Sequence, residues 1–225
     1  MSLPPGQRAM AEFPRFGVVE FAKRVAKDQD IRLKISGGVE QHVVLTAAEL
    51  SRLPRVTLTS DFHCAAGWSH RAVTWSGVRF RDVWETFATP KPDTAGDHGL
   101  VVFRCQDGYR TSLPLADLLA PEVLLADQFN GQPLTLEHGA PIRLVAPAHY
   151  GYKSAKHLIG IEFRADDRSY RPLLGLLDHP RARVALEERG RVFPGWILRY
   201  AFRPFIQPMI RKIKRVTAAG KEIKG

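Results

Sequence analysis

The residue with the most evident chemistry in this chain is Cys64, which lies among small side chains that leave its sulfur open to close approach. Residues 61–69 read Asp-Phe-His-Cys-Ala-Ala-Gly-Trp-Ser, so a histidine precedes the thiol and a tryptophan follows it. A thiolate in such surroundings can act as a nucleophile or as a ligand of a soft metal ion. The alternative is a small apolar side chain that fills the end of a strand. We expect Trp68, the largest residue of the stretch, to belong to the core.

The other cysteine, Cys105, is not at metal-ligand spacing from Cys64, and no CxxC pair is present. This spacing argues against a structural zinc or iron–sulfur centre. Two cysteines in 225 residues do not make a disulfide scaffold. We therefore expect two separate thiols in a reducing compartment, with a disulfide between them as the alternative.

A second group of polar residues could hold an anion. Arg143 stands in the middle of an otherwise apolar run, where a guanidinium requires an anionic or acceptor partner. Residues 150–156, Tyr-Gly-Tyr-Lys-Ser-Ala-Lys, add Lys153, Lys156 and the backbone N–H groups of a loop. Together with His138 they form a candidate phosphate site. The alternative is a set of unrelated surface charges.

The positive charge of the chain is concentrated at its carboxyl end. Residues 1–180 hold 21 basic and 20 acidic side chains, whereas residues 181–225 hold 12 basic and 3 acidic ones. Bases and aromatic residues are mixed over 196–215. This segment is either an extension packed on the domain or an element that docks on a membrane surface or a partner. We expect Pro204 and Pro208 to prevent one continuous helix there.

Short strands, frequent Gly and Pro turns and a few short helices predict a mixed α+β domain with a mostly β core. The predicted strands are 31–35, 41–45, 56–60, 100–104, 142–146 and 158–163. The predicted helices are 46–50, which a capping box of Thr46 and Glu49 opens, 80–87 and 115–119. Turns are expected at 37–38, 75–77, 106–109 and 130–131.

We divide the chain into an amino-terminal arm over 1–30, a domain over 31–180 and a basic aromatic extension over 181–225. The first residues lack the regions of a secretory signal, so we expect a cytoplasmic protein, peripheral to the membrane if the extension docks there. No apolar run approaches the roughly 18 residues that span a bilayer. We expect the protein to be a monomer.

Several motifs, in the same order, resemble the molybdopterin-binding domain of the sulfite oxidase family. They are the 61–69 stretch, the 75–77 turn, residues 130–134, the His-Gly-x-Pro-x-Arg pattern of 138–143, and 151–156. The resemblance covers roughly residues 30–165 and is strongest to the branch of the bacterial protein-methionine-sulfoxide reductase catalytic subunit. It implies the α+β fold of that family, a molybdenum–molybdopterin cofactor and an oxidoreductase.

Residue by residue, the resemblance implies that Cys64 is catalytic and binds molybdenum through its thiolate. The other implied cofactor-binding residues, most of them around the pterin phosphate, are His63, His138, Arg143, Lys153, Ser154 and Lys156. Residues 13–17 resemble the cofactor-contacting arm of the family more loosely.

We expect neither the haem-binding nor the dimerisation domain of sulfite oxidase here, and the basic sulfite-binding set of that enzyme does not follow Cys64. A more apolar pocket is implied, with His63, Trp68, Asp107 and Tyr109 as candidates to line it. We expect oxygen-atom transfer on a small sulfoxide or sulfite-like substrate, with an external one-electron redox partner. The alternative is a non-enzymatic basic module that binds anionic membrane or nucleic acid through its tail. The neutral body and the lack of an RNA-stacking motif argue against nucleic acid.

Overall fold

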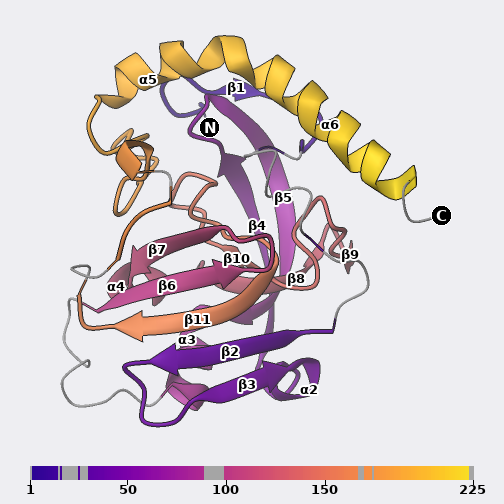
Figure 1. The fold of residues 1–225 in the computed structure, drawn as a ribbon, viewed down its shortest axis with the longest axis vertical. Coiled ribbons are helices and arrows are strands. Elements are labelled where there is room, and N and C mark those ends of the chain that lie inside the picture. Colours follow the sequence, from indigo (N-terminus) through magenta and orange to yellow (C-terminus); the bar gives the residue numbers. More distant parts are fainter. Residues whose placement is uncertain are drawn as a thin grey trace.

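The structure, a computed structural model, describes residues 2–14, 16, 25, 30–88, 99–166, 170–173 and 175–222. In this part of the chain two β-sheets pack together with a few short helices, and two further helices lie along one edge (Figure 1). The α+β class with a mostly β core, which the turn-rich sequence predicted, is confirmed. Of the predicted arm over 1–30, Met1, Arg15 and residues 17–24 and 26–29 lie outside the described residues.

The first sheet carries the strands that lead to Cys64. Its path runs β1-β5-β8-β10, with β4 paired to β5 and β9 paired to β8. Its strands are β1 (Arg8–Ala9), β4 (Arg55–His63), β5 (Trp68–Arg79), β8 (Leu124–Phe129), β9 (Gln132–Pro133) and β10 (Arg143–Val145). β4 and β5 form an antiparallel hairpin, and β1 pairs in parallel with the start of β5. The amino-terminal arm therefore lies beside the turn of this hairpin.

The second sheet has the order β3-β2-β11-β6-β7. Its strands are β2 (Arg32–Gly37), β3 (Val43–Thr46), β6 (Leu100–Cys105), β7 (Arg110–Pro114) and β11 (Leu158–Arg164). The hairpin predicted from residues 31–45 is present as the antiparallel pair β2 and β3. β2 also pairs in parallel with β11, which joins the first third of the domain to its end.

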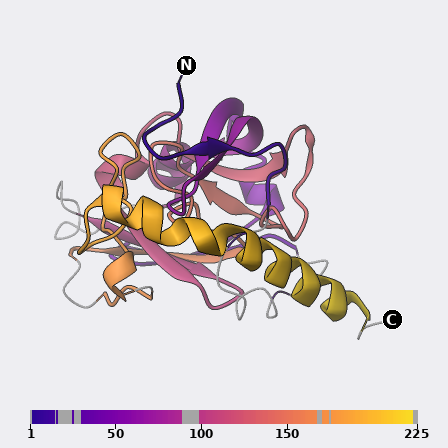
Figure 2. The same cartoon turned by 90° about the horizontal axis from the view of Figure 1, so that it is seen from above.

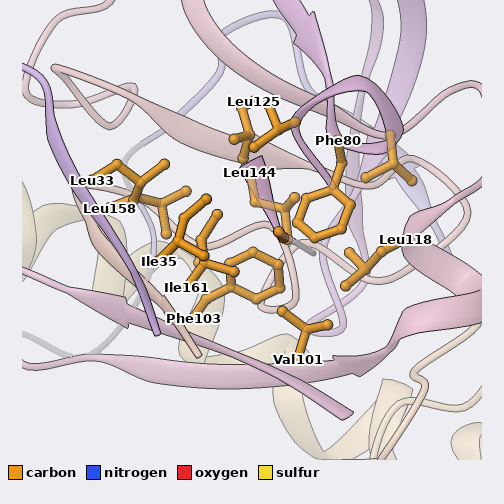
Figure 3. Packing of buried hydrophobic residues seen from close by; sticks show 14 of the residues in the cluster. Leu33, Ile35, Phe80, Val101, Phe103, Leu118, Leu125, Leu144, Leu158 and Ile161 are labelled. Atoms are coloured by element: carbon orange, nitrogen blue, oxygen red, sulfur yellow. The ribbon is translucent and has the colours of Figure 1, made fainter. Parts of the chain in front are cut away.

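The main core joins side chains of both sheets and of two helices (Figure 3). Its buried members include Leu33, Ile35, Phe103 and Ile161 of the second sheet, Leu125 and Leu144 of the first, and Phe80 and Leu118 of the helices. Burying each such side chain contributes roughly 1.5–3 kcal/mol to the free energy of unfolding. This core fixes β8 and β10, and with them the loops that leave β10.

The short helices form where they were predicted. They are α2 (Ala47–Leu50), α3 (Phe80–Phe87) and α4 (Leu115–Leu118), and a 3-10 turn η1 follows at Gly175–Leu177. The capping box of α2 is present, because the backbone N–H of Thr46 donates to Glu49 Oε2 at 2.8 Å.

The predicted turn at residues 75–77 is wrong, because these residues continue β5. Gly77 serves a different purpose: a Cβ there would lie 2.1 Å from the carbonyl oxygen of Leu125 on β8. The glycine lets the two backbones approach where the register of β5 and β8 shifts.

Helix α5 (Gly195–Phe202), the 3-10 turn η2 (Arg203–Phe205) and helix α6 (Ile206–Glu222) follow one another along an edge of the molecule, above β1 (Figures 1 and 2). Pro204 lies in η2 and interrupts the α-helix, as predicted. Pro208 does not interrupt it, because it stands in the first turn of α6, where a missing N–H leaves no helical hydrogen bond unmade. Within the described residues, no helix is long and apolar enough to cross a membrane.

Candidate active site

Cys64 is the first residue of the turn that joins β4 to β5. The turn closes through two backbone hydrogen bonds, from Cys64 N to Trp68 O at 2.8 Å and from Gly67 N to Cys64 O at 3.0 Å. Gly67 has a φ of +102°, a conformation that L side chains rarely adopt. The small residues and the glycine therefore allow a tight turn that places the thiol at the end of the hairpin.

The environment of Cys64 is apolar but faces positive charge. The residue as a whole is partly exposed, whereas its sulfur is surrounded by protein atoms. Burial of its sulfur raises the pKa of the Cys64 thiol to about 12, while a backbone hydrogen bond at Ala66 and the charges of Arg189 and Lys156 act to lower it. A metal ion bound to such a thiol would stabilise the thiolate.

A hydrogen-bond chain connects the hairpin turn to the amino-terminal arm. Ser69 Oγ donates its single proton to Gln7 Oε1 at 3.0 Å. His63 Nδ1 lies 2.7 Å from the same hydroxyl oxygen and must therefore be the donor in that hydrogen bond. Gln7 Nε2 in turn donates to the carbonyl oxygen of Cys64 at 3.1 Å. His63 is thereby held with Nδ1 protonated and Nε2 as an acceptor, and burial lowers its pKa.

Arg189 ties a third segment to the same turn. Its buried guanidinium donates to the carbonyl of Ala65 at 2.6 Å and to that of Pro5 at 2.7 Å, and it pairs with Glu187 at 3.2 Å. Sequence reasoning missed this residue, because it lies in the segment interpreted as an extension. The predicted boundary at residue 180 stays a prediction, but residues beyond it contribute directly to the site.

Phe13 of the arm joins the two halves of the site. Its ring makes edge contacts with four aromatic rings of β4, β5 and β8, at centroid distances of 4.7–5.9 Å, namely Phe62, Trp68, Trp75 and Phe129. It also lies 5.7 Å from the ring of His138. The arm thus bridges the strands of the Cys64 hairpin and the candidate anion site.

The loop over 147–156 lies against the Cys64 hairpin. Gly151 N donates to the carbonyl of His63 at 2.7 Å. A Cβ at Gly151 would lie 2.1 Å from the ring of Phe62, so only glycine permits this contact. The two motifs that the sequence marked separately are therefore neighbours.

Arg143 faces the interior and not solvent. Its fully buried guanidinium donates to the carbonyls of His138 at 2.8 Å and Ser154 at 3.1 Å, and it lies 4.6 Å from the ring centre of Trp75. No carboxylate of the described residues pairs with it, and burial lowers its pKa to about 9. Arg143 therefore joins the segments on either side of β10 and brings an uncompensated positive charge to the site.

Lys153 and Ser154 also point inward. Lys153 Nζ is fully buried and forms an ion pair with Asp178 at 2.5 Å, and it donates to Ser112 O at 3.0 Å. Ser154 Oγ accepts a hydrogen bond from Ala146 N at 3.2 Å. These two predicted cofactor ligands are engaged by the protein itself, and their contacts shape the loop.

His138 and Lys156 remain at the rim of the site. The His138 ring stacks on Phe129 at 4.0 Å, and its Nδ1 lies 2.9 Å from Thr135 Oγ1. Lys156 Nζ donates to the carbonyl of Glu137 at 2.8 Å. Burial together with the charges of Lys156 and Arg143 lowers the pKa of His138 to about 4. Lys156 and Arg143 thus disfavour a protonated His138, and the same positive potential would favour an anion bound beside them.

The predicted pocket-lining residues separate into two groups. His63 and Trp68 lie at the Cys64 turn, and Trp68 is buried, as expected of a core residue. Asp107 and Tyr109 instead close the turn between β6 and β7, where Asp107 Oδ1 accepts from Tyr109 N at 2.9 Å. The Tyr109 hydroxyl donates to Tyr152 O at 2.8 Å, so this pair supports the 147–156 loop from behind.

Comparison with known proteins identifies the class. The family described as "oxidoreductase molybdopterin binding domain" matches residues 20–171, and the chain belongs to it. The protein is therefore an oxidoreductase that uses a molybdopterin cofactor, and the assignment to the sulfite oxidase family is confirmed. The alternative of a non-enzymatic basic module is set aside.

Individual relatives agree with this family. The "uncharacterized oxidoreductase YuiH" of Bacillus subtilis is 36% identical over 73% of this chain and 80% of its own length. The "putative protein-methionine-sulfoxide reductase subunit YedZ1" of Azospira oryzae is 34% identical over 56% of this chain and 46% of its own. The crystal structure of the sulfane dehydrogenase SoxCD from Paracoccus pantotrophus matches with a TM-score of 0.55 and 26% identity, over 64% of this chain and 41% of that one. The chain spans most of the first relative but less than half of the other two.

The residues present fit a molybdopterin cofactor. Cys64 offers a soft metal ligand, and His138 and Lys156 offer donors to a phosphate. The buried Nε1 of Trp68 has no hydrogen-bond acceptor among the described residues. In the same part of the chain, no three His, Cys, Asp or Glu side chains are grouped to hold a metal. A metal at Cys64 would therefore take its other ligands from the cofactor.

Proposed function

We propose that this protein transfers an oxygen atom between water and a small sulfoxide or sulfite-like substrate, with Cys64 as the protein ligand of molybdenum. The observation that carries the proposal is the position of Cys64, at the end of a hairpin whose turn is fixed from three segments. When bound, the cofactor supplies a redox-active metal for oxygen-atom transfer. A thiolate suits such a metal because it is soft and strongly electron-donating.

The remaining residues divide into those that hold the cofactor and those that hold the loops. His138 and Lys156 lie at the rim and would donate to the pterin phosphate. Arg143 adds charge from beneath them, while Lys153 and Ser154 fix the loop on which Lys156 stands. We thus propose that some of the predicted cofactor-binding residues contact the cofactor and that the others hold the loops in place.

The charge near Cys64 bears on the substrate. The charges of Arg189 and Lys156 act on the thiol, but Arg189 is buried and engaged by two carbonyls and a carboxylate. Phe62, which is half-buried and stacks on the buried Trp68 at 5.7 Å, adds apolar surface to this end of the hairpin. These features favour a neutral sulfoxide over an oxyanion. Reduction of a sulfoxide consumes two electrons and two protons and yields a sulfide and water, so we propose an external redox partner that delivers electrons singly.

The test is an assay of the chain produced in a host that makes molybdopterin. Molybdenum per chain is measured, and turnover is followed with methionine sulfoxide and a reduced viologen, and with sulfite and ferricyanide. We expect molybdenum near one per chain and a larger kcat/KM for the sulfoxide. Molybdenum-loaded protein with no activity on either substrate would overturn oxygen-atom transfer, and a preference for sulfite would overturn the choice of sulfoxide.

A further inference from the structure

The exposed side of the segment over 192–215, which begins just before α5 and continues through η2 into α6, carries a surface that we call the carboxyl-terminal strip. Its apolar part consists of large side chains that are exposed by 38–62%, namely Val192, Phe193, Trp196, Ile197, Tyr200 and Phe205. Its basic part consists of the exposed Arg211, Lys212, Lys214 and Arg215 of α6. Large aromatic side chains are rarely exposed in such a row unless they contact something.

The helical part of the strip lies on the side of α5 and α6 that the domain leaves uncovered. Leu198 of α5 and Ile210 and Ile213 of α6 are buried, so the helices pack on the body through one side. Figures 1 and 2 show α5 and α6 lying across the edge of the molecule, with the end of α6 reaching past the sheets. A flat surface could therefore contact the length of the strip without touching the sheets.

Charge in this segment has one sign. Residues 191–216 hold seven basic side chains and no acidic one. Two of these bases have acidic neighbours from other segments, Arg199 with Glu187 at 3.5 Å and the exposed Lys214 with Glu12 at 3.4 Å. The strip therefore attracts an extended anionic surface.

We propose that the carboxyl-terminal strip docks the protein on an anionic lipid bilayer. Tryptophan and tyrosine favour the headgroup level of a membrane, where the ring is apolar and its polar atom stays wet. Aliphatic Val192 and Ile197 can insert beside them, whereas they would gain nothing from stacking on nucleic-acid bases. The bases of α6 would lie over the lipid phosphates. In this arrangement α5 and α6 would lie along the surface of the bilayer and would not span it.

The strip also adjoins the candidate active site. A Cβ at Gly6 would lie 2.4 Å from the Arg199 side chain, so α5 packs directly on the arm whose Pro5 accepts a hydrogen bond from Arg189. A bilayer bound to the strip would therefore lie on the side of the molecule where the arm meets the Cys64 turn.

The test is co-sedimentation of the full chain with phosphatidylcholine vesicles, prepared with and without phosphatidylglycerol. We expect binding only with phosphatidylglycerol, and steep weakening with salt as the Debye length shrinks from about 10 Å at 0.1 M to about 3 Å at 1 M. Trp196 fluorescence should shift to the blue on binding, and the Trp196→Phe variant should bind without most of this shift.

Two variant sets separate the parts of the strip. Replacing Arg211, Lys212, Lys214 and Arg215 by Gln should weaken binding about fivefold per base. Replacing Trp196, Tyr200 and Phe205 by Ser should abolish the residual binding at high salt. The matched control is Val44→Ser with Ile159→Ser, which removes two exposed apolar side chains of the second sheet and should change nothing.

Three results would overturn the proposal. One is a full chain that stays in the supernatant with phosphatidylglycerol vesicles at low salt. Another is equal binding of the strip variants and the control. The third is tighter binding to a single-stranded oligonucleotide than to vesicles, with loss of vesicle binding on its addition, which would make the strip a nucleic-acid surface.

Discussion

Arg189 Nη1 donates a hydrogen bond of 2.6 Å to the carbonyl oxygen of Ala65, the residue after Cys64, although 124 positions separate the two in the chain. The same guanidinium donates to Pro5 and lies 5.1 Å from the ring centre of Tyr150. One buried side chain thus holds the turn, the arm and the 147–156 loop against one another. The geometry of the candidate metal ligand depends on a segment that the sequence presents as a tail.

Replacing Arg189 by Ala should reduce both stability and molybdenum content. The change removes two hydrogen bonds from a charged donor to the carbonyls of Ala65 and Pro5, each worth roughly 1.5–3 kcal/mol. Arg189→Lys should recover part of the loss, because it keeps the charge but not the fork of donors. The free energy of unfolding and metal per chain are measured side by side. Arg191→Ala, an exposed arginine two residues on, is the control, and an equal effect there would refute the role of Arg189.

Replacing Cys64 by Ser should abolish turnover while the fold is kept. A hydroxyl is a harder and weaker donor than a thiolate, so the metal loses its soft protein ligand. The pterin should remain bound through its other contacts, and it can be measured by fluorescence after oxidation. Cys105→Ala serves as the control because Cys105 is buried in the main core and does not reach the turn. Full activity of Cys64→Ser would disprove thiolate ligation.

Replacing Lys156 by Ala should lower the affinity for the cofactor about 10- to 100-fold, and with it the pterin content, because one charge-assisted hydrogen bond is lost. His138→Ala should act in the same direction. Lys34, an exposed lysine of β2, provides the control substitution to Ala. Arg143→Ala should differ from all of these, because its donors serve the protein's own carbonyls, and it should lower the melting temperature of the cofactor-free protein. Unchanged pterin content in the Lys156 and His138 double variant would place the phosphate elsewhere.

Lys153 and Asp178 should behave as a structural ion pair. Replacing Lys153 alone by Met leaves the Asp178 carboxylate buried without a partner and should cost roughly 3–5 kcal/mol. Replacing both, with Asp178→Leu, should restore most of this stability, because an apolar pair needs no compensating charge. Urea unfolding of the two variants gives the comparison. A double variant as unstable as the single one would contradict this account, because the loss would then not come from the unpaired Asp178 carboxylate.

Acid should weaken the segment that carries Arg189. Burial alone would raise the pKa of Glu188, but hydrogen bonds from Arg183 and the charge of His179 outweigh it and lower the pKa to about 2. The folded pKa is below the unfolded value of about 4.3, so Glu188 stabilises the fold above that value. This contribution, at most about 3 kcal/mol, should disappear as the pH falls from 4.3 to 2. Glu188→Gln should be less stable than the wild type at pH 7, and the difference should narrow by pH 3. A difference independent of pH would contradict this account.

Local patterns in the sequence determined much of the fold. The capping box of Thr46 and Glu49, the amphipathic run of α3 and the alternation in β2 each depend on near neighbours in the chain. The failures were Gly77, read as a turn, and Pro208, read as a helix breaker. In both cases the residue type was informative, but its position relative to a neighbouring strand or to the start of a helix decided its effect.

The sequence by itself also identified Cys64, through the small residues around it, as a thiol open to close approach, and its motifs identified the family of the chain. The tertiary structure alone decided which cations face the site. By residue type, Arg143 and Lys153 are strong candidates to bind an anion. In the fold, however, Arg143 donates to backbone carbonyls and Lys153 pairs with Asp178. Arg189 carries no local signal at all. A buried charge takes whichever acceptors the fold brings to it, and those acceptors are distant in sequence, so no local pattern reveals them.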